Sequence, residues 1–215
     1  MADIPTTLRQ QWERDLDALG ASSIPAEKVL TDIVARHNET HRRYHNQRHL
    51  IALFALLDQH AEDVAYGTPT RLAVWWHDLI YDPKATDNEE QSADLARQRL
   101  EALGAKPEII EETVRLILMT KNHGEGPSVG DGDNFLDADL AILGAPPEAY
   151  DAYTIAVRQE YSFAPDDAYR AGRAKFLEAT LARPRLFRTD VFESKYAEQA
   201  RDNMRRELAT FTPSA

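Results

Sequence analysis

Four short stretches of the sequence carry ionisable side chains in otherwise apolar surroundings, and their residue types are those that bind metal ions. One of them, "WWHDLIYDP", places His77 and Asp78 directly after Trp75 and Trp76. Two ionisable groups in such a segment are costly to bury unless something pairs with them. The whole set, in chain order, is His45 with His49, the His77-Asp78 pair, Lys121 with His123, and Asp137 with Asp139. Imidazoles and carboxylates together suit a divalent Mn, Fe, Co, Ni, Zn or Mg ion.

The spacing of these residues allows them to share one ion. If both His45 and His49 are helical, they lie on one face, one turn apart. Asn46 could instead cap the helix, which would leave His45 just outside it. His77 and Asp78 diverge by about 100° if both are helical, yet an ion lying between them can accept both side chains. Such an ion would be the charge partner of the pair, and the two tryptophans would shield it from water.

Each stretch alone also has an ordinary explanation. An aspartate in a first helical turn usually caps the helix or complements its dipole. That explanation fits Asp137 better than Asp139, which follows Ala138. Lys121 and His123 could complement the dipole at a helix C-terminus. Only the combination of all four stretches indicates a metal site.

Helical periodicity dominates the chain and strand alternation is scarce. Thr86, with Glu89 three residues later, is typical of a capping box. The loop at 122–134 is rich in Gly and Asp, and loops of this kind often border active sites. We predict a single all-α domain with helices at about 6–19, 25–38, 46–60, 69–82, 87–104, 107–121, 135–143, 146–163, 166–182 and 193–211.

The composition narrows the functional class. The chain has 215 residues, 43% of them hydrophobic, with a formal charge of −11 and no cysteine. The negative charge disfavours a duplex nucleic acid as partner, and the lack of cysteine excludes disulfides and thiolate metal sites. The longest apolar run, residues 50–57, is too short to span a membrane. The N-terminal sequence lacks the features of a signal peptide, so we expect a cytoplasmic protein.

The arginine-rich segment after residue 170 is either a solvated helix surface or a contact between copies in a homo-oligomer.

The order His49, His77-Asp78 and Asp139 on successive helices resembles the HD superfamily of metal-dependent phosphohydrolases. "YHNQRH" is similar to the His-Asn-x-x-His stretch of cyclic-nucleotide phosphodiesterases. "WWHDLIYDP", "DNEEQSA" and "FLDADLAILG" together resemble a bacterial branch of predicted HD phosphohydrolases. The resemblance covers about residues 40–165 and implies one HD-type domain of about 8–10 helices over residues 1–215.

The resemblance also implies roles for individual residues. It assigns His49, His77, Asp78 and Asp139 as ligands of one or two divalent ions. His45 matches the histidine with which phosphodiesterases protonate the leaving oxygen, and Asp82 matches an acidic position near the attacking water in some HD nucleotidases. Asp137 would then lie behind the ligands.

Further residues are candidates for contacts around the same cleft. Lys121, His123 and Arg158 could hold the substrate phosphate, although Arg158 is also typical of a solvated ion pair. His123 lies where some HD proteins place a ligand of a second metal, but its spacing matches that pattern poorly. Glu89 and Glu90 could reach the cleft or belong to a solvated helix face.

These observations predict metal-dependent hydrolysis of a phosphate ester in a small molecule such as a nucleotide. Metal-activated water would be the nucleophile, and the sequence does not separate monoesters from diesters. Two alternatives are a non-catalytic module that binds a ligand on the same fold, and a di-iron oxygenase. The oxygenase needs more His and carboxylate ligands than the sequence offers after His77-Asp78.

Overall fold

The computed structural model describes residues 4–21, 23–61, 67–123, 128 and 130–211. Within these residues the chain forms ten α-helices, two short 3-10 helices and no strand, which confirms the all-α class. The helices are α1 (Thr6–Leu19), α2 (Ser23–His37), α3 (Gln47–Gln59), α4 (Thr68–Trp76), α5 (Asn88–Ala102), α6 (Pro107–Met119), η1 (Thr120–Asn122), α7 (Gly132–Leu140), η2 (Ala141–Gly144), α8 (Pro147–Glu160), α9 (Asp166–Leu181) and α10 (Asp190–Ala209).

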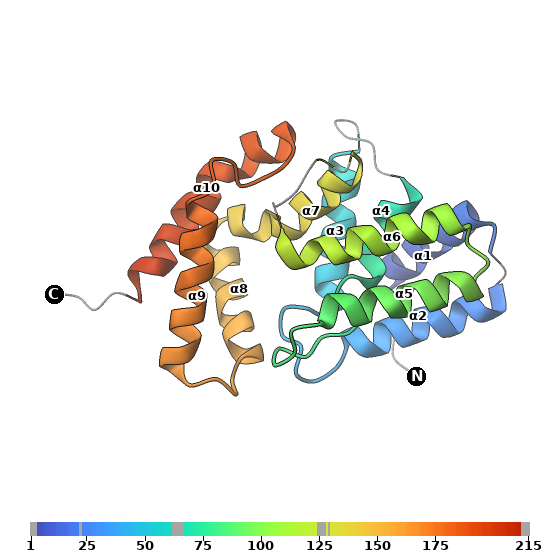
Figure 1. Ribbon diagram of the computed structural model, residues 1–215, viewed down its shortest axis with the longest axis horizontal. Helices are drawn as coiled ribbons and strands as arrows, with labels where there is room; N and C mark the ends of the chain where they lie inside the picture. The colour runs from blue at the N-terminus through green and yellow to red at the C-terminus, as the bar shows by residue number, and fades with distance from the viewer. Residues whose placement is uncertain (1–3, 22, 62–66, 124–127, 129, 212–215) are drawn as a thin grey trace.

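The helices gather into two groups that α7 and η2 connect (Figure 1). Helices α1 to α6 lie on one side, where α6 packs against both α4 and α5. Helices α8, α9 and α10 lie on the other side. Between the groups, α7 packs against α3, and η2 packs against α10. In the described part of the chain, no helix is both long and apolar enough to cross a membrane.

Helix α4 is buried along almost its whole length, which explains its two tryptophans. The rings of Trp75 and Trp76 both pack edge-on against Trp12, and both are fully buried. The indole N–H of Trp75 donates to Asp15 Oδ2 at 2.7 Å, and the guanidinium of Arg71 pairs with the same carboxylate. The tryptophans therefore belong to the core of the first helical group.

Helix α4 ends earlier than the sequence predicts, at Trp76 instead of residue 82. The carbonyl groups that would otherwise continue the helix are satisfied by a distant side chain. The buried guanidinium of Arg42 donates to the carbonyls of Asp78 and Leu79 at 2.6 and 2.8 Å. A helix end needs such partners for its free carbonyls, so a tertiary contact overrides the helical periodicity of the segment.

Helices α7 and α10 both begin three residues earlier than expected. Helix α10 starts at Asp190, not at residue 193, because the side chain of Thr189 caps it by accepting from the Phe192 N–H at 3.3 Å. Helix α7 starts at Gly132, inside the loop that the sequence predicted.

The predicted capping box at the start of α5 is wrong. Its N-cap residue is Asp87, whose side chain makes no capping hydrogen bond. Thr86 instead uses its backbone carbonyl to accept a hydrogen bond from Lys121 Nζ at 2.8 Å.

The contact of η2 with α10 depends on a glycine. A Cβ at Gly144 would lie 2.5 Å from the carbonyl oxygen of Tyr196, which belongs to the α10 backbone and cannot move aside freely. A Cβ at Gly172, within α9, would meet nothing within 4 Å. These two glycines therefore form a matched pair for substitution.

We expect Gly144→Ala to lower the free energy of unfolding by about 1–3 kcal/mol, because overpacking must push η2 away from α10. Gly172→Ala should raise it by about 0.5–1 kcal/mol, because alanine is the better helix former. Urea unfolding at equilibrium measures both changes. Equal effects of the two substitutions would contradict the close approach at Gly144.

Candidate metal centre

Three separate helix ends position the candidate metal-binding residues. The side chain of Asn46 accepts from the Arg48 N–H at 2.9 Å and caps α3, so His49 lies in the first turn and His45 lies outside the helix. His77 directly follows the last residue of α4. Asp139 is the second-last residue of α7.

The side chains of these residues converge on one point. His49 Nε2 lies 3.2 Å from His77 Nε2 and 3.0 Å from Asp139 Oδ1. Asp78 Oδ2 lies 3.1 Å from His77 Nε2 and 3.7 Å from His49 Nε2. Two imidazole nitrogens and a carboxylate oxygen within 4.8 Å of one another, from His49, His77 and Asp139, are a group able to hold an ion. Asp78 lies beside this group.

The centre is closed on its histidine side and open on its carboxylate side. The side chains of His77 and His49 are only 1% and 4% exposed, whereas those of Asp139 and Asp78 are 12% and 22% exposed. The closed side includes the ring of Phe135, edge-on to His77 with its centroid at 5.4 Å. Phe135, not a tryptophan, is thus the aromatic ring against His77.

The electrostatics of the centre demand a positive charge. Burial disfavours the charged form of His77, yet the Asp78 and Asp139 carboxylates raise the pKa of His77 well above its usual value. Burial likewise disfavours charged Asp78 and Asp139, but the neighbouring histidines lower the pKa of both carboxyls well below the usual value. Without an ion, a proton on His77 is the counter-charge of the two carboxylates.

The donor set fits a divalent ion. His77 Nδ1 lies 3.1 Å from the carbonyl oxygen of Val74, so Nδ1 carries a proton. Nε2 is then the nitrogen that would bind an ion in place of a second proton. A ligand histidine held at its second nitrogen by a backbone carbonyl is the usual arrangement in metal proteins. Two imidazole nitrogens with carboxylate oxygens suit the borderline divalent metals.

Arg42 ties together the two segments that flank the centre. Besides the carbonyls of Asp78 and Leu79, its guanidinium donates to the carbonyl of His45 at 3.1 Å. The Arg42 side chain is fully buried, and its Nε also pairs with Glu39 at 3.1 Å. One cation therefore fixes the segment before α3 and the turn after α4 relative to each other.

Glu160, the last residue of α8, positions His45. One oxygen of its fully buried carboxylate accepts the backbone N–H groups of Arg43, Tyr44 and His45 at 2.7, 2.7 and 3.0 Å. The other oxygen lies 2.7 Å from His45 Nδ1 and accepts the Tyr81 hydroxyl at 2.8 Å. Burial alone would raise the pKa of Glu160, but these bonds lower it to about 2. Burial is likewise outweighed at His45, whose pKa is raised by the nearby Asp78 and Glu160 carboxylates.

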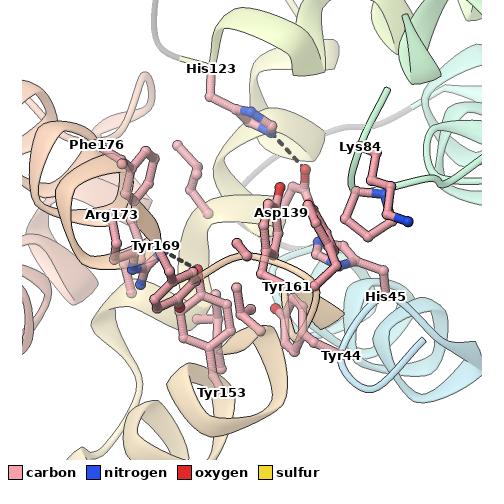
Figure 2. Close-up of a pocket in the computed structure, with 18 of the residues that line it drawn as sticks. Tyr44, His45, Lys84, His123, Asp139, Tyr153, Tyr161, Tyr169, Arg173 and Phe176 are labelled. Atoms are coloured by element: carbon pink, nitrogen blue, oxygen red, sulfur yellow. Dashed lines mark hydrogen bonds and ion pairs between the residues drawn. The ribbon is translucent and has the colours of Figure 1, made fainter. Parts of the chain in front are cut away.

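A pocket opens beside the carboxylate side of the centre (Figure 2). Asp139, His45 and His123 line it next to the centre, and α8, α9 and the loop between them form its far wall. His123 Nε2 lies 2.6 Å from Asp139 Oδ2, so His123 joins the centre at its open side. The structure thus brings together six predicted residues: His45, His49, His77, Asp78, His123 and Asp139.

Three other predicted residues lie outside the centre and the pocket lining. Asp82 is exposed in the turn after α4, where its carboxylate accepts the Lys84 N–H at 2.9 Å. Lys121 pairs with Glu90, and both side chains are partly exposed. Arg158 donates to the carbonyl of Tyr161 at 2.7 Å and to Asp166 at 2.6 Å, so it holds the loop between α8 and α9 together.

Asp137 does not lie behind the candidate ligands, as expected, but bonds to the segment that begins α10. Its buried carboxylate accepts the backbone N–H groups of Arg188 and Thr189 at 2.6 and 2.8 Å, and the Thr189 hydroxyl at 2.7 Å. Asp137 therefore fastens the start of α10, while Asp139 on the same helix faces the metal centre.

Sequence reasoning missed Arg42 and Glu160. Both are charged residues in charged surroundings, "HRRYH" and "VRQEYS", where a solvated side chain is the usual outcome. Arg42 is three residues before His45, but nothing in the sequence indicates its contact with the turn at Asp78.

Comparison with known proteins does not assign the chain to a family. No family model matches it, and neither a curated protein nor a solved structure matches it.

The buried carboxylate of Glu160 predicts a pH-dependent contribution to stability. A carboxyl with a pKa of about 2 in the folded chain, against 4.5 unpaired, stabilises the fold fully above about pH 5. That contribution is lost as the pH falls toward 2. We expect Glu160→Gln to lower the free energy of unfolding by about 2–3 kcal/mol at pH 7, with a difference from wild type that shrinks below pH 4.5.

Urea unfolding between pH 7 and pH 3 tests this expectation. Glu148→Gln, at the exposed opposite end of α8, is the matched control and should change stability by less than about 0.5 kcal/mol. A Glu160→Gln deficit that stays constant with pH would show that the carboxylate charge is not what stabilises the fold.

Proposed function

We propose that the protein is a metal-dependent phosphohydrolase that cleaves a phosphate ester in a small molecule. The observation that carries the proposal is the convergence of His49, His77 and Asp139 with Asp78 beside them, at distances of 3.0–3.7 Å. Structural ion pairs have no need of two buried imidazoles facing each other. The order of these residues along the chain, which resembles the HD superfamily, is a second and independent support.

His49, His77, Asp78 and Asp139 would hold the ion. A divalent cation in this place supplies a Lewis acid for the phosphate oxygens and lowers the pKa of a bound water. The partly exposed carboxylates of Asp78 and Asp139 leave the pocket side accessible to a substrate.

His45 would serve as the general acid. Because its Nδ1 bonds to Glu160, Nε2 is the nitrogen left to donate a proton to the leaving ester oxygen. Because the nearby carboxylates raise the pKa of His45, a larger fraction of His45 is protonated near neutral pH than of a free histidine. Glu160 thus acts as a positioning residue that fixes both the ring and the backbone of His45.

The first test is the metal content of the purified protein by elemental analysis, after equilibration with Mn, Fe, Ni, Zn or Mg and desalting. We expect about one or two ions per chain, lost in His77→Ala and in Asp139→Ala because each removes a ligand. Asp94→Ala, an exposed aspartate of α5, is the control and should retain the metal. A wild-type protein that retains no transition metal would contradict a tight site and favour a non-catalytic binding module.

The second test is hydrolysis of a panel of phosphate mono- and diesters by the loaded protein. We expect His45→Gln to lower kcat about 10²–10⁴-fold with unchanged metal content, since general acids contribute about that much. Unchanged kcat in His45→Gln would remove the general acid from the proposal. A visible absorption band in aerobic, iron-loaded protein, together with no hydrolysis of any ester, would favour a di-iron oxygenase.

A further inference from the structure

The pocket beside the metal centre has the dimensions of a site for an organic ligand. Its volume is about 720 Å³, within the range of typical small-molecule sites. Figure 2 shows Asp139 and His45 on one side and Phe176, Arg173 and Tyr153 on the other. A group attached to a phosphate at the metal centre would therefore extend toward α9.

Aromatic rings dominate the wall of this pocket. Two of them, Phe163 and Phe176, are 47% and 38% exposed, although large apolar side chains are normally buried. Exposed aromatic rings that gather around a cavity are typical of ligand-binding surfaces. The aromatic residues that line the pocket are Tyr44, Tyr153, Tyr161, Phe163, Tyr169 and Phe176.

The charged side chains of the pocket disfavour two classes of ligand, polyanions and cations. Arg173 is neutralised by Glu207, to which it donates at 2.8 and 3.0 Å, so it attracts an anion weakly. Lys84 has no carboxylate partner among the described residues, and its Nζ lies 5.1 Å from the centroid of Phe163. One uncommitted lysine suits one phosphate. A cationic ligand would be repelled by Lys84 and Arg173. These two side chains also already cover the aromatic faces to which a cation would bind.

The described part of the same wall lacks amide side chains and aliphatic hydroxyls. None of the described lining residues is Ser, Thr, Asn or Gln, the side chains that usually read the hydrogen-bonding edges of a ligand. The tyrosine hydroxyls of the lining, among them the buried and unpartnered hydroxyl of Tyr169, can accept or donate one bond each. The larger part of the wall offers ring stacking and apolar contact, which contribute about 1–3 kcal/mol for one stacked aromatic group.

We infer that this pocket binds the organic part of the substrate as a planar aromatic group that carries a single phosphate. Lys84, which lines the same pocket, contacts that phosphate. The inference rests on the proposed phosphohydrolase function, since it takes the metal centre as the place of the phosphate.

The test compares the binding of inorganic phosphate, methylphosphonate, cyclohexylphosphonate and phenylphosphonate by titration calorimetry. These phosphonates are not hydrolysed, so the readout is affinity alone. With Mn²⁺-loaded protein we expect phenylphosphonate to bind about 10-fold or more tightly than methylphosphonate, and more tightly than cyclohexylphosphonate. Lys84→Met should weaken all four ligands by a similar factor.

Gly172→Leu is the decisive variant, because a side chain at Gly172 enters open pocket space without touching the metal centre. It should remove the preference for the phenyl group and leave phosphate binding unchanged. Ala171→Leu, the exposed neighbour outside the lining, is the matched control and should keep the preference. Thermal unfolding of both variants verifies that each is folded.

The outcomes separate the two proposals. Equal affinities for methyl- and phenylphosphonate, with phosphate bound, would overturn the aromatic pocket and leave the proposed function intact. Equal affinities for the cyclohexyl and phenyl compounds would overturn aromatic selectivity in favour of a merely apolar pocket. The protein could also bind phenylphosphonate while retaining neither metal nor phosphate. If Gly172→Leu then abolished this binding, the result would support the aromatic pocket and contradict the phosphohydrolase function. No binding of any compound would overturn both.

Discussion

The guanidinium of Arg42 is the contact on which the rest of the candidate site depends. It donates to the carbonyls of His45, Asp78 and Leu79, so one buried cation joins the segment before α3 to the turn after α4. Without these bonds, the carbonyls at the end of α4 would have to find partners by continuing the helix. Continuation would carry the chain along the axis of α4 in place of the turn that follows His77. The bond to the His45 carbonyl holds the backbone of His45 next to this turn.

The site is also held by a balance of buried charges. The carboxylates of Asp78 and Asp139 need cationic histidines or an ion, and Glu160 needs His45 and three backbone N–H groups. Isolated carboxylates at such depth would be strongly destabilising. Each carboxylate is therefore stabilised by its partners, and each carboxylate in turn holds these partners in position. Mutual dependence of this kind favours a single well-defined geometry of the site.

The sequence predicted what is local and missed what is distant. Helical periodicity and Gly or Pro boundaries are properties of neighbouring residues, so the all-α class and most helix positions followed from them. The choice of Asn46 as a cap was visible as one of two alternatives, and the structure selects it. The end of α4, by contrast, depends on Arg42, which lies 36 residues away from Asp78. Glu160 is 115 residues from His45, and no pattern in one sequence connects two such common residue types.

Helix α7 explains why the metal centre and the aromatic pocket form one unit. Residues two apart on a helix point in nearly opposite directions, and α7 uses this for its two aspartates. Asp139 faces His49 and His77, whereas Asp137 accepts the N–H groups that begin α10. The η2 turn that follows approaches α10 so closely that only glycine fits at Gly144. Any shift of α7 would therefore move Asp139 and the C-terminal helices together. The distance between the candidate metal centre and the pocket wall is thus set by one rigid helix and not by a flexible linker.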